Sequence, residues 1–171
     1  ENDKISNQGI VMLAFDGDKI AFKGRATCGI QGVGTLKKIT KVVGMAPVKD
    51  HHRSGASLSL KNWYGLLGGR RNIFHQDIHT IIMELAMMVS PSLVILDGTT
   101  TMMTNGPTGG SLSDLKQTNT MIVGTDQVAA DAFGATLLDR RFSDLPFIGM
   151  AEAAGLGTAD YRSLDPVELS I

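Results

Sequence analysis

A single cysteine, Cys28, stands in this chain of 171 residues. One cysteine excludes an internal disulfide, a thiolate zinc site and a self-contained iron–sulfur cluster. Its neighbours Thr27 and Gly29 offer no activating base, so we expect an unreactive thiol. The sequence also lacks any run of 18 apolar residues, so we expect no membrane span. No signal peptide is visible, which favours a cytoplasmic protein, while a chain that begins at Glu1 also fits a processed, exported form.

A polybasic tail is absent too, and the formal net charge is only −1, which argues against general nucleic-acid binding. Within this balanced total, one stretch is strongly basic. Eight lysines and arginines stand between Lys37 and Arg71 against one acid, Asp50, a net of +7. All four histidines lie between positions 51 and 79. Cations and imidazoles gathered in one segment indicate a local field for an anion and a place where a proton moves near pH 7.

Hydrophobic periodicity and turn residues predict an α/β order of elements. Asp16-Gly17 between two apolar runs predicts a β-hairpin over residues 9–24. Pro47 is expected to end a short strand at 42–45, and Asp97-Gly98 to end a buried parallel strand at 93–96. Helical spacing of apolar residues predicts a helix from His75 to Val89. We further expect a helix starting within 57–67, a buried strand at 121–123, a helix at 127–138 capped by Thr125 or Asp126, and a short helix within 147–156.

These elements predict one α/β domain with a mixed, partly parallel sheet flanked by helices and an N-terminal β-hairpin. Residues 1–35 would form the hairpin and a glycine-rich loop, 36–145 the core, and 146–171 a C-terminal extension. Ligands of open α/β sheets gather beyond the carboxyl ends of the strands. Here these ends would be 47–57, 97–101 and 124–126, so the basic stretch begins at one of them.

The first group of candidate site residues is Lys49, His51, His52, Arg53 and Lys61. Lysine and arginine could hold a carboxylate or phosphate, and a neutral histidine could accept or deliver a proton. The alternative is a solvated basic loop. Charge pattern alone does not decide between them.

The second group is on and after the predicted central helix. His75 and His79 are four residues apart, hence on one helix face, where they could share a metal or remain core, capping or ligand-facing histidines. The zinc-protease glutamate is missing between them, and we assign no metal ligand. Asp97 could orient a histidine or lysine, hold a cation, or simply belong to a turn.

Two glycine-rich loops could offer backbone amides to an anion. One follows Asn105 and contains Gly106 and Gly109, and the other joins Gly68-Gly69 to Arg70 and Arg71. The first lacks the Lys-Ser/Thr ending of a nucleotide phosphate loop. Either loop could equally be an ordinary connection.

Three segments together resemble a known family: VKDHHRSGASLSLKNWYG, GGRRNIFHQDIHTIIMELAMMVSPSLVILDG and NGPTGG. These segments resemble, in the same order, five elements of the domain-of-unknown-function 362 family. The elements are Lys-Thr-His, then Ser-hydrophobic-Lys-Asn, then a helix that carries His, then a strand that ends in Asp-Gly, and then an Asn-Gly-Pro loop. The resemblance covers about 40–140 and adds Asn62 to the candidate ligand-binding residues. The usual Thr is missing after Lys49, so either His51 or His52 could hold the family position.

The resemblance implies an association with iron–sulfur proteins, because many members carry a ferredoxin-like module with two four-iron–four-sulfur clusters. Such clusters would sit on a partner or a missing module, because Cys28 alone cannot hold them. Three hypotheses follow: an enzyme-like domain that binds a small anionic organic molecule, a redox module beside a ferredoxin-like partner, and a structural or assembly protein. In the first, Lys49, Arg53 and Lys61 grip the anion, His51 or His52 moves a proton with His79, and Asp97 orients a partner. A homo-oligomer is compatible with each.

Overall fold

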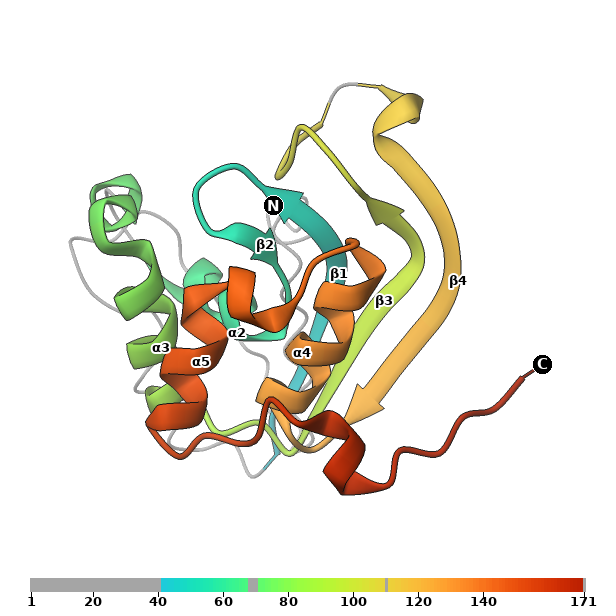
Figure 1. Ribbon diagram of the computed structural model, residues 1–171. Helices are drawn as coiled ribbons and strands as arrows, with labels where there is room; N and C mark the ends of the chain where they lie inside the picture. Colours follow the sequence, from blue (N-terminus) through green and yellow to red (C-terminus); the bar gives the residue numbers. More distant parts are fainter. Residues whose placement is uncertain (1–40, 68–70, 110, 171) are drawn as a thin grey trace.

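The computed structural model of the protein describes residues 41–67, 71–109 and 111–170, which form a four-stranded sheet with helices packed on it (Figure 1). The strand order is β2-β1-β3-β4. β1 and β3 are parallel, whereas β2 and β4 each pair antiparallel to their neighbour. This confirms the mixed, partly parallel sheet. The expected hairpin at 9–24 lies outside the described residues. The strands are β1 (Val43–His51), β2 (Gly55–Ser57), β3 (Leu93–Met102) and β4 (Leu115–Gly124).

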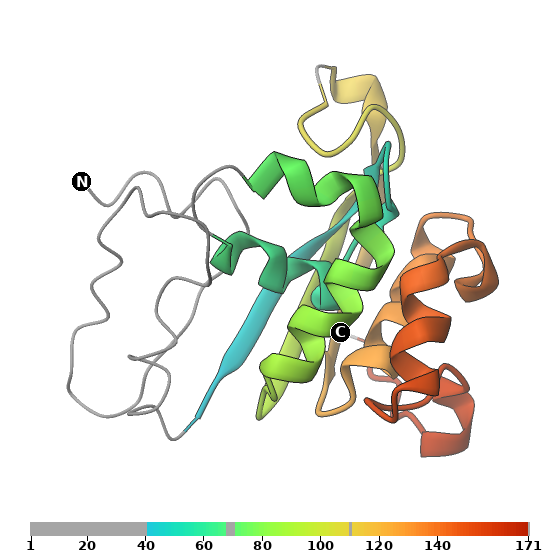
Figure 2. The same ribbon diagram turned by 90° about the vertical axis from the view of Figure 1, so that its left-hand side faces the viewer.

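One face of the sheet carries the core. Val48, Val94 and Leu96 are fully buried on it, and Gly134 of α4 lies close enough that a Cβ there would touch Leu96. Figures 1 and 2 show α4 and α5 on this side, and α3 packs against α5. The helices are α2 (Ser59–Asn62), α3 (Ile78–Met88), α4 (Gln127–Leu137) and α5 (Pro146–Ala153), with 3-10 turns η2 (Trp63–Leu66), η3 (Arg71–Asp77), η4 (Leu112–Asp114), η5 (Phe142–Asp144) and η6 (Tyr161–Leu164).

The first strand is longer than its sequence predicts. β1 continues through Pro47 to His51, so the expectation that Pro47 ends the strand is wrong. Proline lacks an amide hydrogen and is tolerated where one side of a strand is unpaired. β2 pairs with β1 only from Lys49 onward, and the β1–β3 register shifts between Pro47 and Lys49. The strand accommodates Pro47 through this shift of register, and His51 is the last residue of the strand.

Asp97-Gly98 is likewise not the end of a strand. β3 runs on to Met102, and Asp97 pairs with Pro47 on one side and Met121 on the other. The β3–β4 register shifts between Gly98 and Thr100. The Asp97 carboxylate there accepts hydrogen bonds from the Thr99 amide (2.9 Å) and hydroxyl (2.7 Å). The pair of residues that the sequence offers as a turn is therefore a strand irregularity.

Among the described residues, β4 is an edge strand rather than a buried one. Met121 and Val123, expected in the interior, are 61% and 57% exposed. The helix after it begins as predicted, because Asp126 Oδ1 accepts from the amides of Val128 (2.8 Å) and Ala129 (2.9 Å). This confirms Asp126 as the N-cap of α4.

The central helix starts later than the apolar spacing indicates. α3 begins at Ile78, and His75 belongs to the preceding 3-10 segment η3. The backbone of Asp77 (φ −131°, ψ 55°) separates the two. His75 and His79 therefore do not share one α-helical face. Of the helices in the described ranges, none has the length and apolar character to span a membrane.

Candidate functional site

Three imidazoles stack at the carboxyl end of β1. The ring of His51 lies 5.1 Å from that of His52 and 6.0 Å from that of His75, with interplanar angles of 8° and 10°. His51 is the middle ring and is only 2% exposed. Because β1 and β3 are parallel, their carboxyl ends share one edge, and the loop after β3 reaches the same place. His52 Nδ1 lies 3.2 Å from the carbonyl oxygen of Gly106.

The hydrogen bonds of His51 fix its tautomer. Its Nδ1 accepts from the backbone amides of Arg53 (3.3 Å) and Ser54 (3.2 Å), so the ring proton resides on Nε2. Burial is the main cause that lowers the pKa of His51 to about 3, and the positive charges of Lys61, His52 and His75 lower it further. His51 is thus a neutral imidazole with one N–H to donate.

Lys61 and Tyr64 complete the group from the segment that follows β2. The Tyr64 hydroxyl lies 3.1 Å from His75 Nδ1, and the two rings meet edge to face at 4.9 Å. Lys61 Nζ lies 5.1 Å from the centre of the Tyr64 ring, a cation–π contact. Their spacing of three residues across α2 and η2 places both side chains on the same side of the turn. We call His51, His52, Lys61, Tyr64 and His75 the imidazole cluster.

Asp50, the one acid of the basic stretch, is held next to the cluster by other partners. Its Oδ1 accepts from Arg140 Nη2 (2.7 Å) and its Oδ2 from the Gly106 amide (2.9 Å). The side chains of Asp50 and Arg140 are 12% and 30% exposed, so screening by water is modest. Asp50 is thus paired with Arg140, and its charge raises the pKa of His51 less than the ammonium of Lys61 lowers it.

Two of the remaining predicted ligand-binding residues, Asn62 and Gly109, have structural contacts of their own. Asn62 is buried and donates to the Met45 carbonyl (3.0 Å), and the Gly109 amide donates to Asn105 (2.8 Å). The Arg53 side chain is exposed. Burial lowers the pKa of half-buried Lys49. Arg70 lies outside the described residues.

Two predicted catalytic residues lie in other surroundings. His79 stacks on Phe147 of α5, with ring centres 6.1 Å apart. Burial lowers its pKa, and its Nδ1 is buried without a partner among the described residues. Asp97 is exposed in the middle of β3 and bonded to Thr99. The joint action of His79 or Asp97 with His51 stays a prediction.

Sequence reasoning did not select Asp50 or Tyr64, and weighed His75 only with His79. Two signals were available in the sequence. Asp50 is the single acid within a segment of net charge +7, and Tyr64 follows Lys61 by three residues. Neither signal gives the pairing of Tyr64 with His75, because the two residues are eleven positions apart and belong to different 3-10 segments, η2 and η3.

Within the described ranges, no group of three or more His, Cys, Asp and Glu side chains is placed to hold a metal ion. The chain matches the family model described as "Domain of unknown function (DUF362)" over residues 6–136. The match covers well over half of the chain. Searches of curated proteins and of solved structures give no match.

Proposed function

The chain belongs to the DUF362 family, and we propose that it binds a small anionic organic molecule at the imidazole cluster and moves a proton on that molecule. The observation that carries this proposal is the convergence of three imidazoles, an ammonium and a phenol from three separate segments. Clustered titratable groups, one of them a buried imidazole with a lowered pKa, are typical of binding and catalytic sites.

Anion binding is supported by the kinds of donor that meet here. The Lys61 ammonium supplies a full positive charge, and His51 supplies a neutral N–H on Nε2, because its Nδ1 is occupied by two amides. Asp50, which is paired with Arg140, opposes this field at His51 less strongly than Lys61 builds it. A carboxylate or phosphate oxygen is the complementary ligand for an ammonium beside an imidazole N–H.

Proton transfer is supported by the two outer imidazoles. When His52 is neutral, its Nδ1 donates to the Gly106 carbonyl, which leaves Nε2 as an acceptor for a substrate proton. On the other side, the Tyr64 hydroxyl and His75 Nδ1 form a hydrogen-bonded pair through which a proton can pass. His51 between them remains neutral and serves as a donor to the anion.

A calorimetric titration with a panel of mono- and dicarboxylates and phosphate monoesters tests the proposal. Lys61→Met keeps an apolar side chain over the Tyr64 ring but removes the charge. Loss of a charge-assisted hydrogen bond should weaken binding of any anion that the protein takes up by roughly 10- to 100-fold. Lys116→Met, at an exposed lysine paired with Asp139, is the matched control and should leave affinity unchanged. Equal affinities for Lys61→Met and the parent protein would reject the site.

A further inference from the structure

A second feature lies on the other side of the molecule, along the free edge of β4. Within the described residues, β4 pairs only with β3, so its outer row of amides and carbonyls has no strand partner. Unpaired edges of this length are templates for pairing with another chain. A cavity of about 610 Å³ runs along this edge, between residues 119–126 and the segment 166–170, here called the arm.

The arm is an extended segment with its apolar side chains in water. Val167 is 83% exposed and Leu169 85%, and the sequence alternates apolar and polar residues from Val167 onward. A period of two is the pattern of a strand with one buried face. Among the described residues, no backbone hydrogen bond joins the arm to β4.

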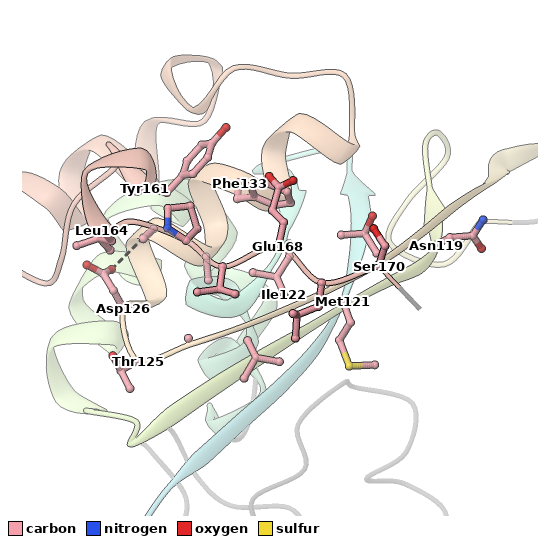
Figure 3. A pocket seen from close by; sticks show the side chains of 18 residues that line it. Asn119, Met121, Ile122, Thr125, Asp126, Phe133, Tyr161, Leu164, Glu168 and Ser170 are labelled. Carbon is pink, nitrogen blue, oxygen red and sulfur yellow. Dashed lines mark hydrogen bonds between the residues drawn. The ribbon is translucent and has the colours of Figure 1, made fainter.

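The base of the arm is fixed, so its direction is determined by the fold. Thr158 donates to Asp126 Oδ2 (3.0 Å), and Tyr161 meets Phe133 edge to face at 5.2 Å. Asp165 then adopts a left-handed conformation (φ 50°, ψ 59°) before Pro166. Figure 1 shows the arm leaving the sheet on the β4 side, and Figure 3 shows Glu168 and Ser170 across the cavity from Ile122.

From this geometry we infer that the slot between β4 and the arm is filled by the arm of a second copy of this chain. Each arm would add to the β4 edge of the other copy and lie beside the other arm, which gives the order β4–arm–arm–β4 across a two-fold axis. This arrangement is closed and reciprocal, as in most soluble dimers. Val167 and Leu169 of the incoming arm would pack toward Ile122, Phe133 and Tyr161, which line the slot.

The chain itself supplies the reason to choose a second copy over another partner. It carries both halves of the contact. One is an edge that has no strand partner among the described residues, beside a slot lined by both polar and apolar side chains. The other is an exposed extended segment in which apolar and polar residues alternate with the period of a strand. The inference is independent of the imidazole cluster, whose residues do not line this slot.

Light scattering coupled to size-exclusion chromatography tests the inference, over loading concentrations from about 1 µM to 1 mM. The parent chain should show twice the monomer mass at the upper end. The double variant Val167→Lys/Leu169→Lys should show the monomer mass throughout. Leu112→Lys, at an apolar residue that is 86% exposed in η4, is the matched control and should remain dimeric.

Hydrogen exchange of the β4 amides separates the alternatives. In the parent dimer, the amides at 119–124 that do not bond to β3 should be protected, and the double variant should lose this protection. A parent chain that is monomeric at 1 mM overturns the inference, as does a dimer that survives the double variant. A monomer whose β4 amides are protected by the arm also overturns it, because the arm would then close on its own strand.

Discussion

Asp131 offers a direct test of how α4 positions the segment that carries Lys61. Its side chain is completely buried in α4, and it accepts from the first two amides of α2: Ser59 to Oδ1 (2.8 Å) and Leu60 to Oδ2 (3.0 Å). These two bonds hold the start of the turn from which Lys61 and Tyr64 reach the imidazole cluster. The carboxyl group is thus remote from the cluster but fixes the segment that builds it.

Burial raises the pKa of Asp131 to about 8, although the amides of Leu60 and Ser59 act in the opposite direction. The unfolded chain releases this proton near pH 4, whereas the folded chain keeps it until near pH 8. A group whose pKa is raised on folding stabilises the protein fully below its unfolded pKa, and this contribution falls as pH rises. Each pH unit between the two values removes about 1.4 kcal/mol.

The variant Asp131→Asn should abolish this dependence, since an amide does not titrate. Between pH 5 and 7 the free energy of unfolding of the parent, measured relative to Asp131→Asn, should fall by roughly 3 kcal/mol. Taking the difference removes the opposite trends of His51 and His79, whose lowered pKa values make the protein more stable as pH rises. Asp139→Asn changes an exposed carboxyl group, and this control should run parallel to the parent.

Urea unfolding at pH 5, 6 and 7, followed by circular dichroism, measures these differences. A constant gap between parent and Asp131→Asn across this range would mean that Asp131 is already ionised in the fold. The two amide bonds would then outweigh burial, and the reasoning would be refuted. A gap that widens in favour of the parent at higher pH would refute it equally.

Three further predictions concern single contacts. Nitrogen NMR should find His51 protonated on Nε2 at pH 7 with a midpoint near pH 3; a midpoint above pH 5 would contradict its buried, doubly accepting position. Gly106→Ala would drive a Cβ into the Asp50 carbonyl, and overpacking of about 1–3 kcal/mol should appear in urea unfolding; unchanged stability would contradict the close approach. Asp126→Ala removes the N-cap of α4 and the hydrogen bond from Thr158. The free energy of unfolding should fall by about 2 kcal/mol, and trypsin should cut faster after Arg162. An unchanged cleavage rate would show that Asp126 does not hold the segment around Arg162.

The sequence predicts the class of fold because its signals are local. Leu93 to Leu96 forms a strand, and Asp126 caps the next helix, as apolar runs and cap residues indicate. The strand limits were wrong at Pro47 and Asp97 for one shared reason. A proline or an Asp-Gly pair ends a strand in isolation, but pairing with β3 or β4 carries the backbone through with a shift of register. Such pairing depends on the neighbouring strands of the sheet, so it cannot be predicted from Pro47 or Asp97 alone.

In the candidate site, too, some contacts could be predicted from the sequence and others could not. His52 stacks on His51 at the end of one strand, and Lys61, ten residues after His51, acts on the pKa of His51. The charge pattern of this short length of chain indicates such a group. Gly106 joins them because parallel strands present their carboxyl ends at one edge, which the predicted βαβ order already required. The order and direction of the strands are therefore enough to predict these contacts.

His75 and His79 show what topology could not give. A helical period across both residues predicts that they face the same way, yet η3 ends at Asp77, and α3 starts with a new backbone direction. A 3-10 segment advances three residues per turn instead of 3.6, so even a short one rotates every side chain before it relative to the helix that follows. His75 consequently turns to Tyr64 and His51, while His79 turns to Phe147. The pairing of His75 with Tyr64 therefore depends on a single change of helical pitch, which the apolar spacing of the segment does not reveal.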